Sequence, residues 1–185
     1  SIALHQFIDG EGSYEVDLLG QVVGIIVENL DKIIDINHYP VEETRRSNSL
    51  HRPIGIGVQG LADLYIKMGL PFESEGADQL NREVFETIYY YALIKSNQLA
   101  KEKGAYETFP GCPLSQGEFQ FDLWGVTPTD RYDWDHLRQE IKLHGVRNSQ
   151  LIALMPTAST SQILGSNECI EPYTSNLYVR RTLAG

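Results

Sequence analysis

Apolar residues recur at three- and four-residue intervals along much of the chain, which is the spacing of helices that bury one face. The spacing predicts helices over residues 14–35, 61–68, 76–103, from 130 or 133 to about 144, and 157–164. Polar residues and glycines separate these stretches. The chain is therefore expected to be rich in helix, with defined breaks between the helices.

Several helix ends carry their own signals. Ser13, and either Asp130 or Asp133, stand where a side-chain oxygen can accept a hydrogen bond from the unpaired N–H groups of a first turn. Gly104 stands where the long third helix should stop, because glycine readily adopts the conformation that ends a helix. These residues fix the expected boundaries.

Short apolar runs between the helices are candidates for strands. Pro53–Val58 and Arg147–Met155 read as buried strands, and Ser175–Leu183 alternates as a third candidate. Strands that alternate with helices predict an α/β fold with parallel strands. Because three strands make a poor sheet alone, the chain fits a portion of a larger barrel or sheet.

Two connections have no such pattern. Residues 36–49 are polar and contain Pro40, so we expect a loop there. Residues 105–129 contain several glycines and prolines and predict a long irregular stretch. We expect its aromatic residues to hold it against the rest of the protein; these are Tyr106, Phe109, Phe119, Phe121 and Trp124.

The sequence "MPTASTSQIL", from Met155 to Leu164, is the first candidate for chemistry. It follows the second predicted strand, and ligands of α/β proteins gather where parallel strands end. Free N–H groups at a helix start attract anions, and the hydroxyls of this stretch add further donors. The pattern is compatible with phosphate binding, although a helix start capped by a hydroxyl explains it as well.

The sequence "GIGVQG", from Gly55 to Gly60, competes for the same role because it matches the glycine spacing of dinucleotide-binding proteins. That fold needs the glycines after a strand, yet here they lie within one. Gly69 and Pro71 also interrupt the unit that should follow. We therefore favour a structural role, in which small residues let a strand pack closely against its surroundings.

Charge and composition exclude other classes. The net charge of −10 repels nucleic acid and anionic lipid, so we expect neither nucleic acid nor membrane as a partner. No apolar run reaches the ~18 residues of a membrane helix. Cys112 and Cys169 lack the spacing of a zinc site, and we expect reduced thiols, no metal and a cytoplasmic protein.

Other polar and aromatic residues carry weaker signals. Glu168 and Glu171 could serve in acid–base chemistry, but two acids in one loop are usually solvated. We expect Tyr89, Tyr90 and Tyr91 to pack on a helix rather than to carry redox chemistry. The histidines at 38, 51, 136 and 144 are expected to be structural or to lie at the surface.

Several long segments together resemble one family. They include "HRPIGIGVQGLAD", "NREVFETIYYYAL", "VTPTDRYDWDHL" and "RNSQLIALMPTASTSQILGSNECIEPYTSNLYVRR". These segments resemble the large, catalytic subunit of class I ribonucleoside-diphosphate reductase, in its eukaryotic and viral type. The resemblance covers nearly the whole chain.

The resemblance implies a fold and a function. The fold would be roughly the second half of a ten-stranded α/β barrel, with residues 1–185 forming one segment of the catalytic barrel domain. The N-terminal half, the nucleotide-binding lobe and the C-terminal tail would lie outside this segment. The reaction would be reduction of ribonucleoside diphosphates to 2′-deoxyribonucleoside diphosphates by a thiyl radical.

The resemblance also assigns a binding loop for the substrate diphosphate. The residues that match the family's loop are Pro156, Thr157, Ala158, Ser159 and Thr160. No catalytic residue is expected in this chain. Asn167 to Glu171 match the Asn-x-Cys-x-Glu spacing that surrounds the family's radical cysteine, but the resemblance places Cys169 where members of the family often carry serine, so Cys169 is assigned no chemistry. The redox cysteine pair is expected before Ser1, and Tyr89 to Tyr91 are not the family's radical-relay tyrosines.

The implied partners are the ribonucleoside diphosphate, the remainder of the large subunit, the small radical-generating subunit and a second large subunit in a homodimer. The family uses a metal and radical cofactor in the small subunit and nucleotide effectors, and this segment is expected to bind no cofactor itself. Two alternatives remain open: a non-catalytic module that only completes a partner chain, and a nicotinamide-binding oxidoreductase that rests on GIGVQG alone.

Overall fold

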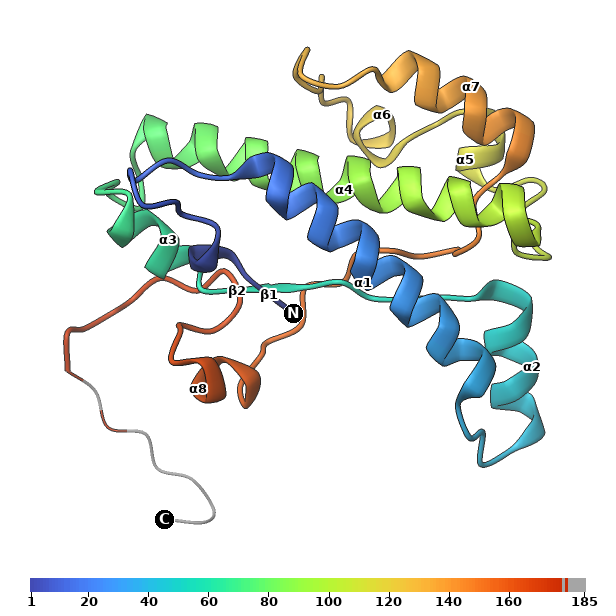
Figure 1. Cartoon of the computed structure of the whole chain (residues 1–185), viewed down its shortest axis with the longest axis horizontal. Helices are drawn as coiled ribbons and strands as arrows, with labels where there is room; N and C mark the ends of the chain where they lie inside the picture. The colour runs from blue at the N-terminus through green and yellow to red at the C-terminus, as the bar shows by residue number, and fades with distance from the viewer. Residues whose placement is uncertain (178, 180–185) are drawn as a thin grey trace.

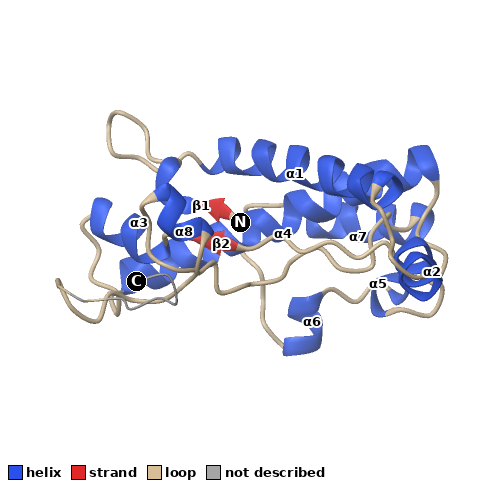
Figure 2. Ribbon diagram, turned by 90° about the horizontal axis from the view of Figure 1, so that it is seen from below, coloured by secondary structure: helices blue, strands red, loops and turns tan. Residues whose placement is uncertain are grey.

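The computed structural model describes residues 1–177 and Val179, and helices make up most of this part of the chain. The two longest helices, α1 (Val16–Ile36) and α4 (Glu75–Lys103), lie side by side (Figures 1 and 2). Their apolar residues meet in one buried core, as the helical spacing predicted. The core residues on these two helices include Leu19, Val23, Val27, Leu80, Val84, Ile88 and Leu93.

The shorter helices surround this pair. In Figure 1, α7 lies on the opposite side of α4 from the strands, and α8 lies beside the strands. A single 3₁₀ turn, η1 (Leu4–Gln6), follows the first strand. The remaining helices are α2 (Glu42–His51), α3 (Leu61–Lys67), α5 (Pro113–Gln116), α6 (Gln120–Trp124), α7 (Trp134–His144) and α8 (Thr160–Leu164).

A small parallel sheet crosses the middle of the molecule. Strand β1 (Ile2–Ala3) pairs with β2 (Val58–Gln59), with Ile2 opposite Val58. On the other side of the same extended segment, Ile56 forms a parallel bridge with Ile152. The N–H of Ala153 donates to the carbonyl of Ile56 at 3.0 Å. Three extended segments therefore lie in parallel, and within the described residues they do not close into a barrel.

The strand predictions are confirmed in part. The run 53–58 is extended and supplies the centre of the sheet, but only residues around 150–153 of the run 147–155 pair with it. The N-terminal strand β1 was not predicted, because two residues are too few to show alternation. In the third candidate, residues 175–177 and 179 are not in a strand, and the rest lies outside the described residues.

The prediction of a loop over 36–49 is wrong, because α2 occupies Glu42–His51. None of its residues is buried, so the helix has no apolar face that periodicity could reveal. Local interactions support it instead: Arg45 pairs with Glu42 one turn earlier, and Arg52 ends the helix in the left-handed conformation.

The helix caps are confirmed at one end and wrong at another. Asp133 accepts a hydrogen bond from the N–H of His136 at 2.8 Å and starts α7, as predicted. Ser13 does not cap α1, which begins after Glu15 without a side-chain cap. Ser13 belongs to a tight turn instead, in which its N–H donates to the Asp9 carboxylate at 2.8 Å.

The stretch 105–129 is less irregular than predicted, since it contains α5 and α6. Tyr106 and Phe119 are buried, and Phe119 contacts the ring of Trp134, so these aromatics anchor the stretch as expected. The prediction is wrong for Trp124, which is 72% exposed.

Within the described part of the chain, no helix combines the length and the apolar character that a membrane crossing requires.

Candidate functional site

The hydroxyl-rich loop lies between the sheet and α8. It follows the paired residues around Ile152, and Thr157 is its buried residue while Pro156, Ala158, Ser159 and Thr160 are exposed. The helix predicted from 157 begins only at Thr160. Three residues of the predicted helix are therefore loop, and their backbone is available for other contacts.

The backbone of this loop presents unused donors. The N–H groups of Thr157, Ala158 and Ser159 donate no hydrogen bond to another described residue. The carbonyls of the same loop are used, because the carbonyl of Thr157 accepts from Ser161 at 2.9 Å and that of Ser159 accepts from Ile163 at 3.2 Å. Backbone donors without a partner at a helix start are an arrangement that can bind anions.

A side-chain contact holds the loop in shape. Thr157 has a φ of 57°, which β-branched residues rarely adopt. Its hydroxyl accepts a hydrogen bond from the N–H of Cys169 at 2.8 Å, and Cys169 also has a positive φ of 41°. Cys169 thus acts through its backbone at this point. Neither Cys169 nor Cys112 forms a disulfide with another described residue.

The two motifs that competed for a phosphate in the sequence lie side by side. A side chain at Gly57 would place its Cβ 2.7 Å from the carbonyl oxygen of Ala153, so the glycine lets two backbones approach. Gly60 adopts a left-handed φ of 73° at the start of α3, and its N–H donates to Asn167 at 3.0 Å. The predicted structural role of these small residues is confirmed at Gly57.

Sequence reasoning missed Asp63, in the first turn of α3. Its carboxylate accepts hydrogen bonds from the N–H of Asn167 at 2.7 Å and from the Tyr173 hydroxyl at 2.8 Å. It ties the segment that follows α8 to α3. The acidic residue three positions after a helix-starting glycine was the available signal. Glu168 and Glu171 belong to the same segment, where the N–H of Glu171 donates to the carbonyl of Glu168.

His5 is a buried histidine next to this region. Its ring packs on Gly60 so closely that a Cβ there would lie 2.4 Å from Nδ1, and Nδ1 has no hydrogen-bond partner among the described residues. Burial lowers the pKa of His5, and the positive charge of Lys67 lowers it further. The folded chain therefore binds a proton at His5 less readily than the unfolded chain does.

This predicts a loss of stability in mild acid. Above the unfolded pKa of about 6.5, His5 is neutral in both states. As the pH falls below this value, the unfolded state binds more protons, which lowers its free energy relative to the folded state. We expect the free energy of unfolding to fall as the pH is lowered from about 7 to about 5.5, and to fall less in His5→Gln. Urea titrations at several pH values measure this. The exposed His38→Gln is the matched control, and equal pH dependence in His5→Gln and the parent chain would contradict the prediction.

The tyrosines at 89–91 pack as the sequence predicted. Tyr90 stacks on Tyr132 with ring centroids 4.2 Å apart, and Tyr89 contacts Trp134.

Among the described residues, no three His, Cys, Asp or Glu side chains gather in a way that could hold a metal ion.

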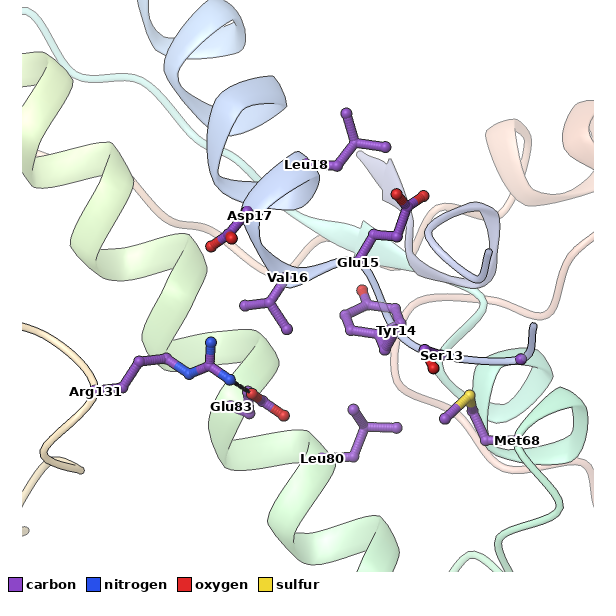
Figure 3. A pocket seen from close by; sticks show the side chains of 11 residues that line it. Ser13, Tyr14, Glu15, Val16, Asp17, Leu18, Met68, Leu80, Glu83 and Arg131 are labelled. Atoms are coloured by element: carbon purple, nitrogen blue, oxygen red, sulfur yellow. Dashed lines mark hydrogen bonds and ion pairs between the residues drawn. The ribbon is translucent and has the colours of Figure 1, made fainter. Parts of the chain in front are cut away.

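A separate cavity of about 620 Å³ lies where α1 begins, and Figure 3 shows its lining. Arg131 and Glu83 point toward one another across it and form an ion pair. Burial and the nearby Glu83 raise the pKa of Tyr14 in its wall. No residue of the loop 156–160 lines this cavity, so the anion-binding arrangement and the cavity are distinct features.

The described residues form a mostly helical protein with a small parallel sheet. A loop with unpaired N–H groups follows one of the paired segments and is compatible with anion binding. A family model described as ribonucleotide reductase, barrel domain, matches residues 1–185. The chain therefore belongs to this family, as the sequence resemblance indicated.

Several relatives are similar in sequence to this chain along its whole length. It is 60% identical to the ribonucleoside-diphosphate reductase large chain of Neurospora crassa and 57% identical to the large subunit of Caenorhabditis elegans. It is 54% identical to the large subunit of variola virus. All three matches cover 100% of this chain, but only 20% to 24% of the relatives, so the chain spans at most about a quarter of their length.

Proposed function

We propose that this chain is part of the large subunit of a ribonucleoside-diphosphate reductase, and that Pro156 to Thr160 bind the diphosphate of the substrate. The observation that carries the proposal is the set of unpaired N–H groups at Thr157, Ala158 and Ser159, held between a parallel segment and a helix start. Family membership supplies the reaction, and the loop supplies the contact with its substrate.

The donors of the loop suit a diphosphate despite the charge of the chain. The loop contains no lysine or arginine, and the net charge is −10, so attraction at long range is absent. Neutral N–H groups can still bind an anion, because they form short charge-assisted hydrogen bonds with it. Exposed hydroxyls at Ser159 and Thr160 add donors of the same kind.

The proposal divides the reaction among several parts. This chain forms a portion of the ten-stranded barrel and holds the diphosphate, while the radical cysteine and the redox cysteines reside in the remainder of the large subunit. A small subunit generates the radical with its metal cofactor, nucleotide effectors act elsewhere, and the complete large subunits form a homodimer. This chain itself binds no metal, and it serves cytoplasmic synthesis of deoxyribonucleotides for DNA replication.

A graft tests the proposal. Residues 1–185 replace the equivalent residues of the Neurospora crassa large chain, and reduction of CDP to dCDP is measured with the partner small subunit. We expect turnover. Ser159→Ala in the graft should raise the KM for CDP about tenfold, because one hydrogen bond to a charged group contributes roughly 1.5–3 kcal/mol.

Ser159 is the informative position because its hydroxyl is exposed, whereas the Thr157 hydroxyl also accepts from Cys169 and its loss disturbs the fold. Ser47→Ala, which removes an exposed hydroxyl from α2, is the control and should leave the KM unchanged. A folded graft that binds CDP but never reduces it would support the non-catalytic module instead. A KM unaffected by Ser159→Ala would remove the loop assignment.

A further inference from the structure

We propose that Gln59 is a positioning residue for the diphosphate loop: its buried amide holds both ends of α8 against β2 and thereby aims the free N–H groups of the loop. The inference rests on the proposed function and deepens it. It also gives a role to Gln59, the polar side chain of GIGVQG, which the sequence analysis left without one.

The burial of Gln59 is complete. Its relative exposure is 0%, and it lies on β2 opposite Ala3. Burying a side-chain amide away from water costs free energy unless both its oxygen and its nitrogen form hydrogen bonds within the protein. Its partners are therefore part of what keeps the surrounding segments in place.

The partners of the amide come from three separate segments. The Ser1 hydroxyl donates to Oε1 at 2.7 Å. Nε2 donates to the Ser166 hydroxyl at 3.3 Å and, more weakly, to the carbonyl of Thr160 at 3.5 Å. Ser1 and Thr160 also approach one another, with 3.4 Å between their hydroxyl oxygens. One side chain thus links the N-terminal segment, the start of α8 and the turn after α8.

Thr160 and Ser166 lie at the two ends of α8. Thr160 is its first residue, and Ser166 follows Gly165, the residue at which the helix ends. A five-residue helix is too short to be stable by itself, so its position depends on contacts at its ends. Gln59 supplies contacts at both ends of α8 from strand β2.

The position of α8 decides where the loop donors point. The N–H of Ser161, inside α8, donates to the carbonyl of Thr157 at 2.9 Å, so loop and helix move together. The N–H of Ser166 donates to the carbonyl of Ser161, also at 2.9 Å, which couples the far end of α8 to the same turn. Donors held in place before the ligand arrives bind more tightly than donors that must first be ordered.

Gln59→Met tests the role, because methionine has a similar length and no hydrogen-bonding amide. In the graft described above, we expect the KM for CDP to rise about tenfold while kcat changes less than twofold. The dissociation constant for inorganic pyrophosphate should rise by the same factor. Gln150→Met, which changes an exposed glutamine in a neighbouring extended segment, is the matched control and should alter neither value.

A second variant keeps the test decisive if Gln59→Met does not fold. Ser166→Ala removes one partner of the amide and should raise the pyrophosphate dissociation constant about threefold. If both variants fold, their combination should have less effect than the product of the two, because they share one interaction.

The outcomes separate this inference from the proposed function. If the parent graft binds pyrophosphate and Ser159→Ala weakens it, but Gln59→Met and Ser166→Ala do not, the positioning role is overturned and the loop assignment stands. If Gln59→Met lowers kcat and stability without changing pyrophosphate binding, Gln59 is merely structural. If the parent graft binds no pyrophosphate, both proposals fail.

Discussion

Replacing Asp31 by alanine should lower the free energy of unfolding by about 3–5 kcal/mol. Asp31 is fully buried on α1, and the guanidinium of Arg52 donates to its Oδ1 from Nε at 3.0 Å and from Nη2 at 2.8 Å. Asn148 donates to the same oxygen at 3.2 Å. The carboxylate therefore joins α1, the end of α2 and the segment that leads to the sheet.

The large effect follows from what alanine would leave behind. The side chain of Arg52 is only 6% exposed, and the buried Nε of Arg147 lies 3.7 Å from Oδ1 of Asp31 with no hydrogen-bond partner among the described residues. Without Asp31, the buried guanidinium of Arg52 keeps only the half-exposed Asp35 as an anionic partner, and Arg147 and Lys103 lose the carboxylate that they face. Removing one partner of a buried pair costs more than the pair contributes, because the remaining charge is uncompensated.

Urea titration of the parent chain and of Asp31→Ala measures this difference. Asp35→Ala is the matched control, since Asp35 contacts the same guanidinium, with 2.7 Å between Nη1 and Oδ1, but its side chain is 51% exposed. An exposed pair contributes roughly 0–1 kcal/mol, so Asp35→Ala should have a small effect. Equal losses in the two variants would contradict the importance of burial at Asp31.

Gly57→Val should cost about 3 kcal/mol in stability and should also abolish pyrophosphate binding at the loop 156–160 that we propose as the diphosphate site. The nearest atom to a new Cβ is the carbonyl oxygen of Ala153 at 2.7 Å, which is backbone and cannot rotate away. The next is the terminal methyl carbon of Met155 at 3.0 Å. The segment that these residues form leads directly into Pro156, so displacing it displaces the loop.

The two parts of this prediction need separate measurements. Urea titration gives the stability, and titration with pyrophosphate at a temperature where the variant remains folded gives the binding. Gly10→Ala is the matched control, because a Cβ at Gly10 meets no atom within 4 Å and its φ is not in the left-handed region. Unaltered pyrophosphate binding by a folded Gly57→Val chain would mean that the loop does not depend on this close approach.

The long helices were predictable because their signal is repeated many times. In α1 and α4 the apolar residues recur over five or more turns, and each repeat confirms the register. In α2, by contrast, no residue is buried, so its sequence contains no periodic pattern of apolar residues that would predict a helix. Strand β1 was missed for a different reason: its two residues are too few to show a period.

The candidate loop was found from its residue types, while its supports were not. Hydroxyls after an apolar run are visible in the sequence of Thr157 to Thr160. The hydrogen bond from Cys169 to Thr157 joins positions twelve apart, and the amide of Gln59 meets Ser166 across 107 positions. The residues next to each of these positions in the sequence give no signal that would predict such long-range contacts.

The sequence alone determined the family, the long helices and the place of the hydroxyl loop, because each of these depends on residues close together in the chain. Only the tertiary structure decided that Asp31 and Arg52 form a buried pair, that Gly57 allows a close backbone approach, and that Gln59 lies beside α8. The physical reason is that these features arise from burial and from pairing between distant segments, and the free energy of both depends on neighbours that only folding brings together.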